Sequence, residues 1–266
     1  GGVGGGGDVI LKTGNQLGCL LADYVFLSLK ETGKMPAKPA MVNSIVTTGM
    51  QGRIAKHYGV RLYECLTGFK WIADVMAQTE SSGEAKIVFG TEESYGFLVE
   101  DEVRDKDGIS AAAMTAEMTL YWRSKGKSLL DRLNELYEIC GYWEEMQINK
   151  YFPGIEGPGI MEGIMSDYRK NPPATLGGIK VIKVRDLKNG APPAELSPHG
   201  LPPSDVLQFY LEDGTVVNAR PSGTEPKIKF YASCCSPVTE GLDAAKKEAD
   251  RKLKAITQDI KTKIGD

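Results

Sequence analysis

The order of apolar segments between residues 14 and 125 constrains the fold of the chain most. Strand-length apolar runs alternate there with longer segments whose apolar side chains recur every three or four positions. The runs of strand length are 41–46, 60–64 and 86–89, and the helical segments are 14–33, 69–79, one that Gly59 ends and one that Asp107 caps. This alternation predicts a three-layer α/β/α domain with a parallel or mixed sheet.

After Gly126 the pattern changes, and Ser128 precedes a helical segment that we expect to bridge two domains. Strands near 143–151, 179–184, 206–211, 215–219 and 228–232 and helices near 157–170 and 242–260 follow, with a proline-rich loop at 190–203. This second part is expected to be a smaller α+β domain. The expected division is a linker and orphan strand (1–13), an α/β domain (14–127), and the bridging helix with the α+β domain (128–266).

Composition and charge exclude several classes of protein. The net charge of −3 argues against nucleic-acid binding, which needs a basic surface. No apolar run is long enough to cross a membrane. Five cysteines without a CxxC pair indicate neither a disulfide framework nor a zinc site, so a reducing cytoplasm is expected. The opening GGVGGGG is expected to be a flexible linker ahead of a strand that begins elsewhere, which suggests a piece of a longer protein.

The segment from Arg220 to Pro226, RPSGTEP, has the residue types of an anion site between two strands. Arg220 offers a planar fork of donors that suits phosphate. Ser222 and Thr224 add hydroxyl groups, and Gly223 lets the backbone close around a ligand. The alternative is an ordinary tight turn with a surface arginine.

Two further segments carry candidate binding residues. Glu92 and Ser94 follow a strand at its carboxyl end, where open α/β sheets bind ligands, and in an extended loop residues two apart point the same way. A carboxylate and a hydroxyl group aimed together suit two neighbouring sugar hydroxyls. The alternative is a solvated loop. Lys70, in TGFK, begins a helix and is either a ligand or an exposed lysine.

These segments resemble motifs of the α-D-phosphohexomutases, the family of phosphoglucomutase and phosphomannomutase. RPSGTEPKIKFY is similar to the family's phosphate-binding loop, GTEESYGF to its sugar-binding loop, and TGFK to a segment that contacts the phosphosugar. TGNQLG and EESYGF are most similar to the phosphoglucomutase subgroup. The resemblance implies a second domain with the TATA-box-binding-like fold of the family's C-terminal domain. It also implies three sets of substrate-binding residues: Arg220, Ser222, Gly223 and Thr224 for the phosphate, Glu92 and Ser94 for sugar hydroxyls, and Lys70.

The family's catalytic motifs are not in this sequence. The chain has no Ser-His pair for the phosphorylated serine and no DGDxDR-like magnesium loop; Asp105 and Asp107 come closest but precede a helix. The resemblance therefore implies domains three and four of a phosphoglucomutase. The parent would interconvert glucose 1-phosphate and glucose 6-phosphate through a phosphoserine, Mg²⁺ and glucose 1,6-bisphosphate, whereas this chain alone is expected to be inactive and to bind no cofactor. Phosphomannomutase, phosphopentomutase and a non-catalytic phosphosugar-binding module are the alternatives.

Overall fold

The structure is a computed structural model that describes residues 2–3, 9–99, 103–193 and 196–265. Most of the expected N-terminal linker, residues 1 and 4–8, lies outside the described residues. Next to it, β1 (Gly2–Val3) and β2 (Val9–Ile10) form a short antiparallel pair. The chain divides into two compact units, Gly1–Gly141 with Pro192–Leu201 and Tyr142–Ala191 with Pro202–Asp266. Each unit is described by itself.

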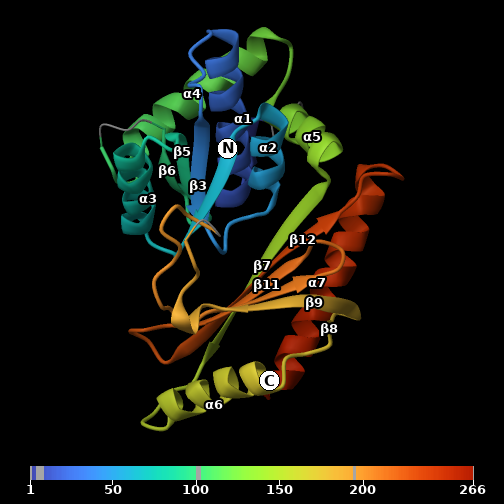
Figure 1. Ribbon diagram of the computed structural model, residues 1–266. Helices are drawn as coiled ribbons and strands as arrows, with labels where there is room; N and C mark the ends of the chain where they lie inside the picture. Colours follow the sequence, from blue (N-terminus) through green and yellow to red (C-terminus); the bar gives the residue numbers. More distant parts are fainter. Residues whose placement is uncertain (1, 4–8, 100–102, 194–195, 266) are drawn as a thin grey trace. The chain divides into compact units, whose positions relative to one another are not determined.

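The first unit contains a mixed four-stranded sheet (Figure 1). Strand β3 pairs in parallel with β4 and β5, and β6 adds an antiparallel edge to β5. The strands, in the order in which they lie in the sheet, are β4 (Arg61–Cys65), β3 (Pro39–Ser44), β5 (Lys86–Glu92) and β6 (Gly96–Leu98). The expected mixed sheet is confirmed.

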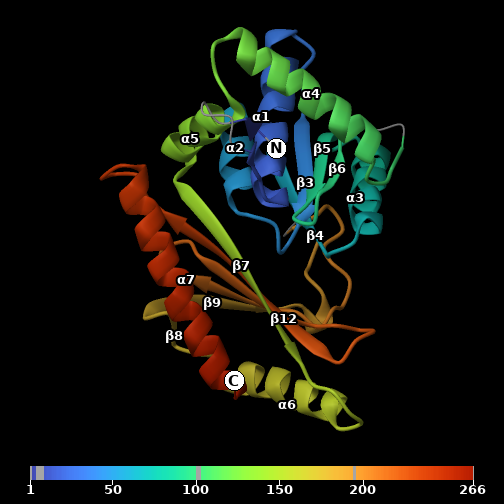
Figure 2. The same cartoon turned by 180° about the vertical axis from the view of Figure 1, so that it is seen from behind.

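Helices cover both faces of this sheet (Figures 1 and 2). On β5, a Cβ at Gly90 would touch Ile72 of α3 (Phe69–Ser82), whereas the next residue, Thr91, faces Gly18 of α1 (Gly14–Glu31). Successive strand residues thus face α3 on one side and α1 on the other. Helix α2 (Met50–Tyr58) packs beside α1, and α4 (Gly108–Ser124) packs against β6 and α1. The predicted three-layer α/β/α arrangement is confirmed.

Side-chain caps explain where several helices begin. Asp107 accepts hydrogen bonds from the backbone N–H groups of Ile109 and Ser110 at 2.9 Å each, as the sequence predicts. Ser128 caps α5 (Leu129–Cys140) in a capping box with Asp131. The N–H groups at a helix start have no intrahelical partner, so these side chains satisfy them and define the boundary.

The structure differs from the expected boundary at 127/128, because α5 packs in the first unit against α1, α2 and α4. An ion pair anchors it. The Arg132 guanidinium donates to the fully buried Asp23 carboxylate at 2.6 and 2.9 Å, and the Tyr58 hydroxyl donates to the same carboxylate at 2.8 Å. The break between the units falls after α5, between Gly141 and Tyr142.

Part of the proline-rich loop also belongs to the first unit. The backbone carbonyl of Leu196 accepts a 2.8 Å hydrogen bond from the N–H of Glu64, next to the end of β4. Leu196, Ser197 and Leu201 are buried. The loop character of 190–203 is as predicted, but its return to the first unit depends on contacts that sequence patterning does not report.

The second unit is built on a six-stranded antiparallel sheet. The predicted hairpin around Glu212–Gly214 is present, with Tyr210 opposite Val216. The strands, in the order in which they lie in the sheet, are β7 (Tyr142–Tyr151), β12 (Lys227–Ser236), β11 (Val216–Pro221), β10 (Leu207–Leu211), β9 (Ile179–Asp186) and β8 (Thr175–Leu176). A short 3-10 helix, η1 (Leu187–Asn189), follows β9.

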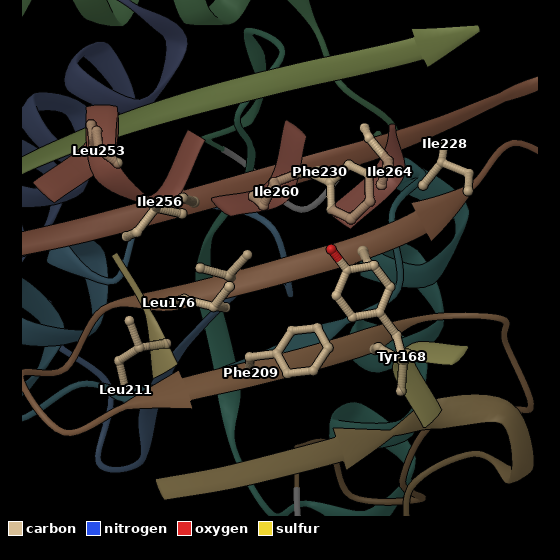
Figure 3. Packing of buried hydrophobic residues seen from close by; sticks show 14 of the residues in the cluster. Tyr168, Leu176, Phe209, Leu211, Ile228, Phe230, Leu253, Ile256, Ile260 and Ile264 are labelled. Atoms are coloured by element: carbon tan, nitrogen blue, oxygen red, sulfur yellow. The ribbon is translucent and has the colours of Figure 1, made fainter. Parts of the chain in front are cut away.

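Two helices, α6 (Gly157–Lys170) and α7 (Leu242–Ile264), form the core of this unit with the sheet. Figure 3 shows Tyr168 of α6 beside Phe209 and Phe230 of the sheet, with Ile256 and Ile260 of α7 in the same apolar cluster. Each fully buried large apolar side chain contributes about 1.5–3 kcal/mol to stability. The predicted α+β domain is confirmed. Within the described part of the chain, no helix is both long and apolar enough to cross a membrane.

Candidate functional site

The segment from Arg220 to Pro226, which we call the phosphate loop, comprises the last two residues of β11 and the connection to β12. The N–H of Ser222 donates to the carbonyl of Lys227 at 2.8 Å and closes the loop at its base. The Ser222 hydroxyl oxygen accepts hydrogen bonds from the N–H groups of Thr224 and Glu225 at 3.4 and 3.3 Å. Because the oxygen of Ser222 is occupied in this way, its hydroxyl proton is available to an anion.

Arg220 is half-buried at the end of β11, and none of the described residues forms an ion pair or side-chain hydrogen bond with it. The neighbouring carboxylate of Glu225 is already neutralised by Lys227, at 2.6 Å. The Arg220 guanidinium is therefore a cation with no counter-ion in the described part of the chain, next to a hydroxyl group that can donate. Such a pair suits a phosphate group.

The phosphate loop borders a hollow of about 560 Å³ that lies wholly within the second unit. Lys188 of η1 lines it and has no described ion-pair partner, whereas Arg169 of α6 is held by Asp186 and Asp205. The other residues that line this hollow come from α6, the segment 204–205 and the phosphate loop: Pro158, Met161, Glu162, Met165, Ser166, Ser204, Asp205, Arg220, Pro221, Ser222 and Gly223.

The segment with Glu92 and Ser94, which we call the sugar loop (residues 92–95), is not extended. Strand β5 ends at Glu92, residues 93–95 make a tight turn, and β6 begins at Gly96, directly opposite Glu92. Tyr95 has a left-handed backbone, with φ of 61°. The expectation that Glu92 and Ser94 point the same way because they are two apart in an extended chain is therefore wrong. Whether both bind sugar stays a prediction.

Glu92 points toward the start of α3. One of its oxygens accepts a 2.6 Å hydrogen bond from the N–H of Gly68, which has φ of 115°. A Cβ added at Gly96 would meet the Phe69 ring at 3.0 Å and the second Glu92 oxygen at 3.4 Å. Burial raises the pKa of the Glu92 carboxyl above its ordinary value, and the Gly68 hydrogen bond partly offsets this.

Glu93, the first residue of the turn, has different partners from Glu92. Its carboxylate accepts from the hydroxyl of Ser44 at 3.1 Å and from the hydroxyl of Ser94 at 3.3 Å. Sequence reasoning missed Gly68, Glu93 and Ser44. Their contacts join segments that are distant in the sequence, and no pattern along the chain reports them.

Lys70 lies in the first turn of α3, exposed to solvent, with its ammonium group 4.9 Å from the centre of the Trp71 ring. It is two residues from Gly68, so the TGFK segment and the sugar loop meet at Glu92. Asp107 is a helix cap and Arg104 pairs with Glu80, so neither is free for a ligand.

The chemistry available in the described residues is binding chemistry. They contain no group of three or more His, Cys, Asp or Glu side chains that could hold a metal ion. The five cysteines are buried, and the described residues contain no disulfide bond. Burial raises the pKa of Cys65, and it raises that of Cys234 to about 11, so both thiols are protonated and weakly nucleophilic at neutral pH.

Comparison with known protein families gives two adjacent matches. Residues 13–140 match the model of the phosphoglucomutase/phosphomannomutase α/β/α domain III, and residues 180–251 match the model of the C-terminal domain of the same family. The phosphate loop and the sugar loop thus lie in different domains of one family.

Curated relatives and a solved structure agree with these matches. The chain is 35% identical to a phosphoglucomutase of Staphylococcus epidermidis over 85% of its own length, and 33% identical to one of Staphylococcus aureus over 87%. It spans only 41% of the length of each. The open form of the exocytosis-sensitive phosphoprotein pp63/parafusin from Paramecium has the same fold, with a TM-score of 0.64 at 17% identity, over 98% of this chain and 43% of that one. The chain belongs to the phosphoglucomutase/phosphomannomutase family and comprises its domain III and its C-terminal domain.

Proposed function

We propose that this chain binds a phosphosugar, as the substrate-binding part of a phosphoglucomutase. The observation that carries the proposal is the Arg220 guanidinium, which pairs with none of the described residues and lies beside the Ser222 hydroxyl. Arg220, Ser222, Gly223 and Thr224 hold the phosphate group, and Glu92 and Ser94 hold hydroxyl groups of the sugar. Lys70, a solvated cation beside the Gly68–Glu92 contact, adds positive charge near the substrate.

The protein groups bind and orient, and the phosphoryl-transfer chemistry belongs to the complete enzyme. In that enzyme, glucose 1-phosphate and glucose 6-phosphate interconvert through a phosphoserine and glucose 1,6-bisphosphate. Mg²⁺ would supply charge neutralisation for the transfer. The described residues of this chain do not fit a magnesium site, so no step is assigned to the metal here.

We propose glucose phosphates as the substrates because the relatives at 33–35% identity are named phosphoglucomutases. The family model covers phosphomannomutase as well. We also propose a cytoplasmic location, which the presence of five cysteines with no disulfide bond among the described residues supports.

Calorimetric titration of the 266-residue chain with glucose 6-phosphate and with inorganic phosphate tests the binding role. We expect both to bind, and glucose 6-phosphate to bind more tightly. In a coupled assay with glucose 1-phosphate, Mg²⁺ and a trace of glucose 1,6-bisphosphate, we expect no turnover above a contaminant control. Turnover by this chain would contradict the division of labour proposed here, and absence of any phosphate binding would contradict the role of Arg220.

A further inference from the structure

The proposed function leaves Glu93, the middle residue of Glu-Glu-Ser, without a role. We propose that Glu93 is a positioning residue that sets the hydrogen-bond polarity of the sugar loop. Through it, Ser94 presents lone pairs to the substrate, so that Ser94 and Glu92 both act as acceptors and the two sugar hydroxyls must both donate. This inference rests on the proposed function.

A chain of hydroxyl groups behind the sugar loop fixes the direction of these hydrogen bonds. Ser44 is 1% exposed, and its hydroxyl lies 2.9 Å from the hydroxyl of Thr47 and 3.1 Å from a carboxylate oxygen of Glu93. An ionised carboxylate can only accept. The Ser44 proton therefore goes to Glu93, and the Thr47 hydroxyl donates to Ser44.

The second oxygen of Glu93 accepts the proton of the exposed Ser94 hydroxyl at 3.3 Å. With its proton directed back to Glu93, Ser94 offers only lone pairs to a ligand. Glu92 is limited in the same way, because one carboxylate oxygen accepts from Gly68 and the other can only accept. Both candidate sugar ligands are thus acceptors.

The start of α1 packs against the turn at residues 93–95. This close packing accounts for Gly14, the first glycine of the TGNQLG motif. A Cβ at Gly14 would lie 2.0 Å from the carbonyl oxygen of Glu93, so only glycine allows this approach. The Tyr95 hydroxyl donates to the carbonyl of Lys12, two residues before Gly14, at 2.8 Å. Two contacts with the segment that leads into α1 therefore restrain the turn that carries Glu93 and Ser94.

Replacing a sugar hydroxyl by fluorine tests the polarity directly. Fluorine is similar in size to a hydroxyl group and is a weak acceptor, but it has no proton to donate. We expect glucose 6-phosphate analogues with fluorine at either of the two recognised ring positions to bind the 266-residue chain about tenfold more weakly than glucose 6-phosphate itself.

Two variants then separate positioning from mere structure. In Glu93→Gln, the amide oxygen accepts from Ser44 and the amide nitrogen donates to Ser94, whose proton is released toward the ligand. We expect the analogue whose fluorine faces Ser94 to regain most of its tenfold loss of affinity. Ser94→Ala should instead weaken glucose 6-phosphate to the level of that analogue. Glu31→Gln is the control, since Glu31 is an exposed carboxylate of the same unit that also accepts from a hydroxyl group, that of Tyr121.

The titrations are run at pH 8, with thermal unfolding of each variant measured in parallel. Equal binding of glucose 6-phosphate and every fluorinated analogue, with all of them tighter than inorganic phosphate, would overturn the polarity inference and leave the proposed function standing. Unchanged discrimination in folded Glu93→Gln would also overturn it. If glucose 6-phosphate binds no more tightly than inorganic phosphate, the sugar-loop part of the proposed function fails, and the inference fails with it.

Discussion

The backbone N–H of Gly68 donates a 2.6 Å hydrogen bond to the carboxylate of Glu92, joining the start of α3 to the end of β5. Gly68 has a φ of 115°, a backbone conformation that favours glycine. One oxygen of Glu92 is thereby held, and the other remains for a ligand. Two segments far apart in sequence thus act as one local structure.

The first prediction concerns this contact. Gly68→Ala should cost about 1–3 kcal/mol of stability, because a side chain disfavours this backbone conformation, and it should weaken glucose 6-phosphate binding while leaving inorganic phosphate binding unchanged. Gly83→Ala is the matched control at the other end of α3, since Gly83 also has a positive φ, of 63°. It should lose stability but keep sugar binding; equal sugar binding in both variants would contradict the role given to Gly68.

The second prediction concerns pH. Burial raises the pKa of Glu92 in the folded state, so its contribution to stability is greatest at low pH and is lost as the pH rises through that pKa. The stability of Glu92→Gln relative to the wild type should therefore increase from about pH 4 upward. Urea unfolding at several pH values measures this.

Glu248 gives a control of opposite sign for that measurement. A hydrogen bond from Arg251 lowers the pKa of Glu248, so its contribution is present at neutral pH and lost on acidification. Glu248→Gln should lose stability relative to the wild type as the pH rises. If Glu92→Gln also lost stability relative to the wild type as the pH rises, burial would not disfavour the ionised form of Glu92.

The third prediction concerns Arg220. Arg220→Ala should weaken phosphate and glucose 6-phosphate binding by about 1.5–3 kcal/mol, the contribution of a charge-assisted hydrogen bond. The melting temperature should change little, because no described residue pairs with Arg220. Arg251→Ala removes the same charge from an exposed pair with Glu248 and should leave binding unaffected. Calorimetry on both variants distinguishes a specific site from general attraction of anions.

The fourth prediction concerns the ion pair that holds α5. Arg132→Met should destabilise the first unit by about 3–5 kcal/mol, because among the described residues it leaves the buried Asp23 carboxylate with only the Tyr58 hydroxyl as a partner. Replacing both members, as in Asp23→Leu with Arg132→Met, should recover much of this loss. Chemical denaturation measures both, and a loss below about 1 kcal/mol for the single variant would show that the pair is dispensable.

Local signals in the sequence predicted the elements of the fold well. Asp107 and Ser128 cap the helices that they were expected to cap, and the turn at Glu212–Gly214 joins the expected hairpin. These signals did not place α5 in the first unit. Its position there depends on the buried contact of Arg132 with Asp23, two residues that are distant in the sequence. The contact of Leu196 with β4 likewise joins residues that are distant in the sequence.

The candidate site was predictable in its residues but not in its geometry. The spacing of Glu92 and Ser94 predicted side chains that point the same way in an extended chain. The chain instead turns at residues 93–95, so the spacing does not fix their directions. The role of Gly68 depends on a backbone N–H, and a sequence does not report backbone direction. The close approach of Gly14 to Glu93 likewise follows from packing between α1 and the turn.

The most direct test of the central claim is a nuclear magnetic resonance titration of the 266-residue chain that follows the backbone amides of both loops. Glucose 6-phosphate should shift the signals of residues 222–225 and 92–95 with one dissociation constant, whereas inorganic phosphate should shift only those of 222–225. Shifts at 222–225 alone with glucose 6-phosphate, or shifts in neither loop, would contradict the claim that the two loops bind one phosphosugar.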